Sequence, residues 1–296
     1  MAGGLSITVL VENTVNRRGL LAEHGLAFWL ERGGRRILFD TGQGMALAHN
    51  ADKLGIDLSS ANDVVLSHGH YDHTGGLLAA LPEFKAAAVY ADHEAFCDRF
   101  VRDLQTGVRS VRSPIESFEW LTRRVARVVR TDRGPVDLGD GIRLTGRIPR
   151  QNAFEDAGGA FYLDSACTRP DAVMDDQALY AETGSGVAVL LGCAHAGVVN
   201  TLDFICAATG KSRIFAVIGG MHLLNANEFR MEQTIRKLRD LDVQRVGLAH
   251  CTGFAAMARL NHELPNRCFS CVAGTRIEFE ADLEESSRCH PKTKCR

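Results

Sequence analysis

The sequence predicts an α/β fold in which β-sheets are covered by helices in layers. The first half of the 296-residue chain is rich in apolar segments of strand length, and the second half alternates strand-like and helix-like segments. Hydrophobic residues make up 45% of the chain and charged residues 24%, which is typical of a folded protein. This composition excludes a disordered chain and a collagen-like repeat.

The expected elements follow from hydrophobic spacing and turn residues. Strands at 26–30 and 36–39 flank Gly33 and Gly34, which suit the tight turn of a hairpin. Further strands are expected at 6–12, 63–66, 86–90, 126–130 and 142–148, with helices at 45–54 and 77–81. The second half predicts strands at 179–182, 187–191, 214–218, 245–248 and 274–280, and helices at 198–208, 228–238 and 255–260.

These elements suggest one domain over residues 1–281, followed by a polar, cysteine-containing tail at 282–296. Two stretches, near 93–124 and 150–176, fit the pattern poorly and are interpreted as insertions. Insertions near a site often form its lid or its walls.

Charge and hydropathy limit the partners that we expect. The chain has 34 Lys and Arg against 36 Asp and Glu, so its formal charge of −2 gives no general attraction to nucleic acid or to an anionic membrane. The longest apolar run, around 187–191, is far shorter than the ~20 residues that cross a bilayer. The chain also begins without the basic region of a secretory signal. We therefore expect a cytoplasmic protein without nucleic-acid or membrane partners. A homo-oligomer is compatible with the sequence.

The most informative segment is a dense group of histidines directly after the strand at 63–66. Within six residues it contains His68, His70, Asp72 and His73. His68 and His70 are two residues apart and should point to one side, as ligands of one ion, whereas Asp72 and His73 lie on the following turn and can reach a neighbouring ion. Imidazole with carboxylate suits zinc, iron or manganese better than calcium or magnesium. The alternative is a surface histidine cluster.

Two later histidines occupy similar positions. His195 follows the strand at 187–191 and His250 follows the strand at 245–248, each just before a helix. Ligands gathered from strand ends at one edge of a sheet form a rigid, concave site. We therefore interpret both as candidate ligands.

The chain resembles the metallo-β-lactamase superfamily over about residues 5–281. The resemblance lies in four features that follow one another along the sequence: Asp40-Thr41-Gly42, the 68–73 motif, His195 and His250. The resemblance implies an αββα sandwich with a metal site at one edge of its two sheets. It implies one or two divalent ions, with zinc favoured over iron or manganese. The implied ligands are His68, His70 and His195 for the first ion, and Asp72, His73 and His250 for the second. Asp40 would support the site through hydrogen bonds.

Further motifs resemble one branch of this superfamily, the 7,8-dihydropterin-6-methyl-4-(β-D-ribofuranosyl)aminobenzene-5′-phosphate synthase group. They are residues 175–179, 192–197 with Asn200-Thr201, 219–223 and 250–253. One departure concerns the strand at 214–218, after which many two-metal members carry a bridging aspartate. This chain has Gly219-Gly220-Met221-His222 there. His222 is expected to contact substrate or transfer a proton, with metal ligation or a structural role as alternatives.

The branch implies a metal-dependent enzyme that acts on a phosphorylated or pterin-like small molecule through a metal-bound water or a metal-bound leaving group. Asp72 would orient the attacking group, and Tyr71 and Thr74 would contact substrate. The nearest alternative is a hydrolase of phosphodiesters, lactones or thioesters. A diiron redox enzyme and a non-catalytic sensor are further alternatives.

Several weaker sequence signals could point to further binding or metal sites. Arginines at 109–112, 123–124 and 143–150 could bind a substrate phosphate, although most such residues are surface side chains. Cys193 and Cys251 adjoin expected ligands and could be nucleophiles, oxidation-sensitive neighbours or simply buried residues. A small zinc site or redox pair could involve Cys268, Cys271, Cys289 and Cys295. Surface or core roles are expected for His24, His49, His93 and His262.

Overall fold

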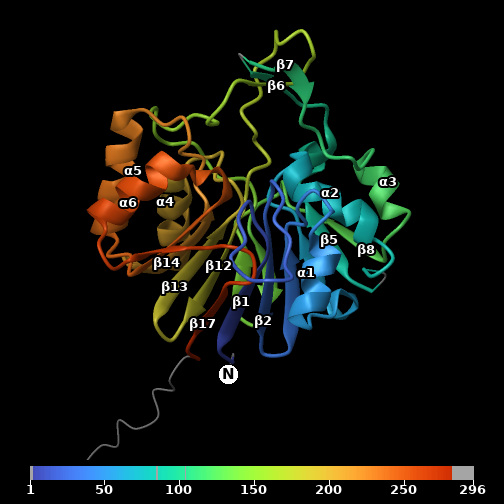
Figure 1. The fold of residues 1–296 in the computed structure, drawn as a ribbon, viewed down its shortest axis with the longest axis horizontal. Coiled ribbons are helices and arrows are strands. Elements are labelled where there is room, and N and C mark those ends of the chain that lie inside the picture. The colour runs from blue at the N-terminus through green and yellow to red at the C-terminus, as the bar shows by residue number, and fades with distance from the viewer. Residues whose placement is uncertain (1–2, 85, 104, 282–296) are drawn as a thin grey trace, which may run out of the picture.

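The computed structural model describes residues 3–84, 86–103 and 105–281. Two seven-stranded sheets lie face to face between two layers of helices, as Figure 1 shows. The fold is therefore the αββα sandwich that the sequence indicated. No helix in the described part of the chain combines the length and apolar character that a membrane span requires.

The first sheet has the strand order β17-β1-β2-β3-β4-β5-β8. The strands β17, β1, β2 and β3 are antiparallel, and the strands from β3 to β8 are parallel. Their bounds are Arg276–Phe279 (β17), Leu5–Val11 (β1), Ala27–Arg32 (β2), Arg35–Phe39 (β3), Asp63–Val65 (β4), Ala88–Ala91 (β5) and Arg127–Arg130 (β8).

The second sheet has the strand order β16-β15-β14-β13-β12-β10-β9. Its first four strands are parallel, and the remaining pairs are antiparallel. Their bounds are Cys268–Ser270 (β16), Arg245–Ala249 (β15), Ile214–Gly220 (β14), Gly186–Leu191 (β13), Ala178–Thr183 (β12), Ile142–Leu144 (β10) and Val136–Gly139 (β9).

Three apolar cores hold the layers together. The first lies between the two sheets and joins residues such as Ile7 and Leu190. The second packs the second sheet against α4 (Val198–Thr209), α5 (Glu228–Asp240) and α6 (Phe254–Glu263), and the third packs the first sheet against α1 (Leu47–Leu54), α2 (Tyr71–Ala80) and α3 (Phe118–Thr122). Burying these apolar faces is the main force that fixes the layer order.

A small third sheet projects beyond one end of the sandwich, at the top of Figure 1. It consists of β11 (Phe161–Tyr162), β6 (Phe100–Asp103) and β7 (Gly107–Ser110). Its strands are largely exposed or half-buried, so it has little core of its own. The buried guanidinium of Arg99 joins it to the sandwich through an ion pair with Asp175, with a distance of 2.6 Å between Nη2 and Oδ1.

Helix α2 begins earlier than its sequence predicts. The expected start was residue 77, because Gly75 and Gly76 are poor helix formers. Both glycines are required by close packing instead, since a Cβ at Gly76 would lie 2.0 Å from the carbonyl oxygen of Thr41 and a Cβ at Gly75 would lie 2.4 Å from that of Gln43. The helix therefore starts at Tyr71 and carries Asp72 and His73 in its first turn.

Candidate metal centre

The residues of the expected centre gather at one edge of the sandwich. The loop at 67–70 follows β4, and the loops that carry His195 and His250 follow β13 and β15. β13, β14 and β15 are parallel neighbours, so their carboxyl ends meet at the same edge. Residues up to 182 positions apart are brought together there.

The first group consists of His68, His70 and His195, all buried. His68 Nε2 lies 3.0 Å from His70 Nδ1. The ring of His195 lies 4.7 Å from that of His68 and 4.9 Å from that of His70. One candidate ligand atom from each residue lies within 4.8 Å of the others, which is close enough for all three to bind one ion.

The second group consists of Asp72, His73 and His250. Nε2 of His250 lies 3.3 Å from Asp72 Oδ2 and 3.3 Å from Nε2 of His73. Asp72 Oδ2 lies 3.9 Å from Nε2 of His73. The carboxylate and the two ring nitrogens thus face one another beside the first group, since the rings of His68 and His73 are 4.3 Å apart.

Hydrogen bonds at the opposite ring nitrogens fix how these imidazoles are presented. Nδ1 of His73 donates to Asp40 at 2.7 Å, Nδ1 of His250 donates to Asn13 Oδ1 at 2.8 Å, and Nδ1 of His195 donates to the carbonyl of Ala157 at 2.7 Å. A proton on Nδ1 leaves the lone pair on Nε2, the tautomer that a metal ligand needs. Nε2 of His195 is buried and has no hydrogen-bond partner among the described residues.

Asp40 organises both groups at once. Its carboxylate accepts hydrogen bonds at 2.7 Å from the backbone N–H and the hydroxyl of Ser67, in addition to the bond from His73. The Ser67 hydroxyl in turn accepts from Nδ1 of His68 at 2.9 Å. One buried carboxylate therefore orients a ring in each group.

Side chains of residues 175–177 form hydrogen bonds with the backbone of the segments that carry His68, His70 and His195. Asp175 accepts from the N–H of Gly69 and Asp176 accepts from that of Ala196, both at 2.8 Å. The Gln177 amide donates to the carbonyl of Leu66 at 2.7 Å. These bonds explain why this segment accompanies the histidine motifs in the sequence.

The electrostatics suit a divalent cation. Burial lowers the pKa of His68, His70 and His195 well below the usual value for histidine, so these rings are neutral. Burial also opposes charge on His73, but the carboxylates of Asp40 and Asp72 outweigh it and raise the pKa of His73 to about 9. Burial raises the pKa of Asp72, but the charge of His73 and hydrogen bonds from His24 and His250 outweigh this and hold it well below its usual value. The three neutral imidazoles of the first group, the ionised Asp72 carboxylate and the unpartnered buried Nε2 of His195 fit a zinc, iron or manganese ion, which would displace the proton that His73 holds without it.

His24 lies at this centre, although its sequence context predicted a surface or core role. Its side chain is 52% exposed, yet its Nε2 lies 3.1 Å from Asp72 Oδ2. Its ring lies 5.0 Å from that of His250. His24 belongs to the loop between β1 and β2 and to no motif, so the sequence carried no signal for it.

A cavity of about 530 Å³ opens beside both groups. The third sheet forms part of its wall through Val101, Arg109 and Phe161, so both insertions reach the site. Phe161 packs 4.8 Å from the ring of His70. The cavity also exposes His24, Tyr71, Asp72, His222, Leu224 and Phe254.

Thr74 does not line this cavity. It is fully buried, and its hydroxyl donates to the carbonyl of His70 at 3.0 Å. The structure therefore gives no support to the expected substrate contact at Thr74, because helix α2 turns its side chain back into the motif. Tyr71 does line the cavity, one position into the same helix.

His222 faces the first group, with its ring 4.3 Å from that of His195. Its backbone φ of 43° is unusual for a residue with a side chain, and such strain clusters at functional sites. Burial, aided by the charge of Arg230, lowers the pKa of His222 to about 4. A neutral ring can contact substrate but does not act as an acid at neutral pH. Of the two expected roles of His222, substrate contact is therefore favoured over proton donation.

Of the arginines in the basic stretches, Arg109 lines the cavity, with its guanidinium 5.8 Å from the centre of the Tyr71 ring. Several others have partners elsewhere: Arg112 pairs with Asp98, Arg147 pairs with Asp92, and Arg150 donates to the carbonyl of His195. Arg109 is therefore the arginine best placed for an anionic substrate.

A second zinc site, considered above as one option for the C-terminal cysteines, is not formed by those that the structure describes. Cys268 lies on β16 and Cys271 is buried, and neither joins a group of metal-ligating residues within the described ranges. Cys289, His290 and Cys295 lie outside the described residues.

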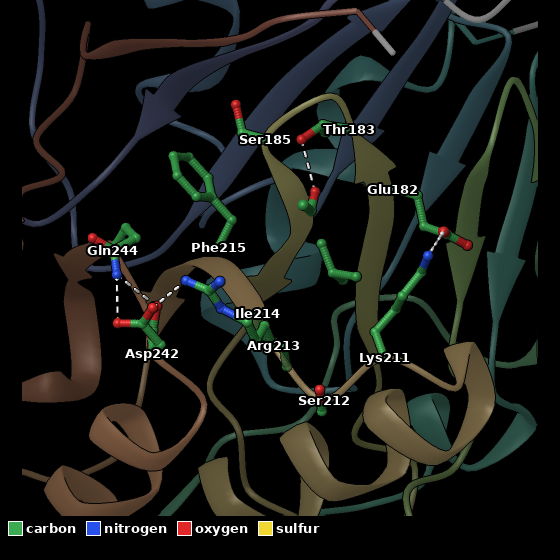
Figure 2. Close-up of a pocket in the computed structure, with 12 residues that line it drawn as sticks. Glu182, Thr183, Ser185, Lys211, Ser212, Arg213, Ile214, Phe215, Asp242 and Gln244 are labelled. Atoms are coloured by element: carbon green, nitrogen blue, oxygen red, sulfur yellow. Dashed lines mark hydrogen bonds and ion pairs between the residues drawn. The ribbon is translucent and has the colours of Figure 1, made fainter. Parts of the chain in front are cut away.

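A second cavity, of about 640 Å³, lies where β13 and β14 begin, away from the histidines (Figure 2). Its charged side chains are paired with one another, Lys211 with Glu182 and Arg213 with Asp242. It contains none of the histidines of the motifs. The cavity beside the histidines is therefore the candidate site.

Comparison with known proteins agrees with this geometry. Residues 21–146 match the family model described as the metallo-beta-lactamase superfamily. A relative from Methanocaldococcus jannaschii is 30% identical over 275 residues, which cover 87% of this chain and 90% of the relative. The chain belongs to the metallo-β-lactamase superfamily, and is an enzyme of that type.

That relative is named 7,8-dihydropterin-6-methyl-4-(β-D-ribofuranosyl)-aminobenzene-5′-phosphate synthase. Among solved structures, Tm1679, described as a metal-dependent hydrolase of the β-lactamase superfamily, is 28% identical, with a TM-score of 0.78 over 93% of this chain and 99% of that one. YhfI from Bacillus subtilis is 15% identical with a TM-score of 0.58, over 93% of this chain and 99% of that one, and shows the fold alone.

Proposed function

We propose that the protein is a metal-dependent enzyme that acts on a phosphorylated or pterin-like small molecule. Two adjacent ligand groups would hold two divalent ions, His68, His70 and His195 the first, and Asp72, His73 and His250 the second. The observation that carries the proposal is the convergence of these side chains beside a cavity that His70, Asp72, His195 and His250 line together with Arg109. The name of the M. jannaschii relative supports the substrate class.

The ions, when bound, would supply Lewis acidity, which activates a nucleophile or stabilises a leaving group. Asp72 faces the cavity and accepts hydrogen bonds, so it would also orient the attacking group. His222 would position the substrate from the side of His195. The third sheet would limit the access of water to the reacting atoms.

The walls of the cavity indicate what the substrate carries. Phe161, Leu224 and Phe254 offer apolar surface to a flat ring, while Arg109 offers a guanidinium to a phosphate. An aromatic heterocycle with a phosphate group matches both features.

A hydrolase of phosphodiesters, lactones or thioesters is the second candidate, and the likeness to Tm1679 favours it. The same ligand chemistry would also suit a diiron redox enzyme. Metal content separates these chemistries, because zinc performs no redox step.

The test begins with elemental analysis of protein purified without added metal. The holoenzyme is then incubated with the diphosphate ester of a 6-hydroxymethyl-dihydropterin and a ribofuranosylaminobenzene phosphate. Separate incubations use bis-aryl phosphate, lactone and thioester substrates. We expect a condensation product with release of diphosphate, absent in His68→Ala and present in the exposed matched control His262→Ala. Hydrolysis without condensation would assign the protein as a hydrolase of phosphodiesters, lactones or thioesters. Metal binding without turnover of any of these substrates would overturn both the condensation and the hydrolase proposals.

A further inference from the structure

Cys193 lies at the centre of the histidine cluster, although the two proposed ligand sets do not include it. Its Sγ lies 3.1 Å from Nε2 of His73. The same sulfur belongs to one group with His68 and His73, and to another with His250 and Cys251, in each of which the candidate ligand atoms lie within 4.8 Å of one another. The side chain of Cys193 is buried.

The neighbouring strand cannot supply a ligand from the corresponding position. β14 lies between β13 and β15, and it ends in Gly219 and Gly220. A Cβ at Gly219 would lie 2.1 Å from the carbonyl oxygen of Leu191. A Cβ at Gly220 would lie 2.5 Å from the carbonyl oxygen of Gly192 and 2.7 Å from Sγ of Cys251. Backbone and sulfur thus exclude a carboxylate side chain at this end of β14.

The second ligand group leaves room for a further donor. Asp72, His73 and His250 provide one oxygen and two nitrogens, so an ion held by them has at least one more position, which a protein side chain or a substrate group can occupy. Thiolate is a ligand that zinc, iron and cobalt all accept. Sγ of Cys193 lies 3.1 Å from Nε2 of His73, closer than Nε2 of His250 at 3.3 Å and the Asp72 carboxylate at 3.9 Å.

We propose that the thiolate of Cys193 is a ligand of the ion held by Asp72, His73 and His250, in place of a carboxylate from β14. This inference rests on the proposed function, because it requires an ion at that position. On binding, the S–H bond breaks, its proton passes to solvent, and the sulfur forms a bond to the ion.

Cys251 is the less suitable of the two thiols. Its sulfur accepts a hydrogen bond from the backbone N–H of His222 at 3.3 Å and contacts the carbonyl of Cys193 at 3.7 Å. Both contacts engage its sulfur, although the side chain also lines the cavity. Cys251 would support the backbone of the neighbouring loops.

The test replaces the native metal with cobalt(II) and records absorption spectra. A thiolate ligand gives an intense sulfur-to-cobalt charge-transfer band in the near ultraviolet, whereas the weaker visible bands report any bound cobalt. We expect wild type, Cys251→Ser and the distant control Cys206→Ser to show both features. Cys193→Ser and Cys193→Ala should keep visible bands from the first ion and lose the charge-transfer band. Their affinity for the second cobalt equivalent should fall about tenfold or more, as for the loss of other groups that hold a metal.

The outcomes separate the two proposals. Absence of bound cobalt in folded wild-type protein, with folding checked by circular dichroism, would overturn the proposed function and this inference together. Three results with bound cobalt would overturn the inference alone. The charge-transfer band could be missing in wild type, it could persist in both Cys193 variants, or it could be lost in Cys251→Ser.

Discussion

The side chains of Asp40 and His73 form a 2.7 Å hydrogen bond in which both partners are fully buried. The bond joins the end of β3 to the first turn of α2, and the same carboxylate also holds Ser67 behind His68. The position of two proposed ligand rings, those of His68 and His73, thus depends on one residue that belongs to neither proposed ligand set. Its contribution can be measured without altering any proposed ligand.

We expect Asp40→Asn to lower the affinity for metal by about 10- to 100-fold, the usual effect of removing a group that orients a ligand. Asparagine keeps the size of the side chain but removes the charge. Competition with a chromogenic chelator measures the change. Asp52→Asn, at an exposed position on α1, is the matched control. Equal affinities for Asp40→Asn and wild type would show that Asp40 does not orient the ligands.

The pH dependence of stability should reveal Asp176. Burial raises the pKa of this carboxyl to about 7 in the folded protein, against 3.8 for an unperturbed aspartate. Between these values the folded state holds a proton that the unfolded state has lost, so this group reduces stability as the pH rises from about 4 to 7.

Asp176→Asn removes that titration while retaining an oxygen that can accept from Ala196. In metal-free protein, the loss of stability between pH 5 and pH 8 should therefore be smaller in Asp176→Asn than in wild type. Urea titrations at the two pH values measure it, with Asp52→Asn as reference. Parallel losses in the variant and wild type would contradict the raised pKa.

Arg109 should govern binding of an anionic substrate rather than the chemical step. A hydrogen bond to a charged group contributes about 1.5–3 kcal/mol, so Arg109→Ala should raise KM by about 10- to 100-fold while kcat changes little. Arg123→Ala, an exposed position that does not line the cavity, serves as control. An unchanged KM in steady-state assays would remove Arg109 from the substrate site.

The buried pair of Arg99 and Asp175 should stabilise both the third sheet and the loop that carries His68 and His70. Removal of one partner leaves an unpaired buried charge, so Arg99→Ala should lower the free energy of unfolding by about 3–5 kcal/mol. Arg102→Ala removes an arginine of β6 that is exposed, and should cost much less. Equal urea midpoints for the two variants would show that the buried pair contributes nothing.

Much of the fold and centre could be predicted from the sequence because their signals are local. The strand at 63–65 and the histidines that follow it are contiguous, and His195 and His250 repeat the pattern of a strand end before a helix. The structure brings all of these side chains together. Their roles as ligands remain predictions that the cobalt experiment addresses.

The remaining features depend on contacts that no local pattern records. His24 reaches Asp72 because the loop after β1 folds over the first turn of α2. The early start of α2 depends on the backbone around Thr41, which makes Gly75 and Gly76 necessary. Thr74 shares a motif with ligands, yet the helix turns it inward. Each of these depends on how distant segments pack.

The third sheet lines the cavity with Val101, Arg109 and Phe161 but supplies none of the proposed ligands. Under the proposed function, part of the substrate contact, through Arg109 and Phe161, would come from stretches of the chain that hold no proposed ligand. Variation at the exposed positions of this sheet would then change which compound is bound and leave the proposed ligands in place.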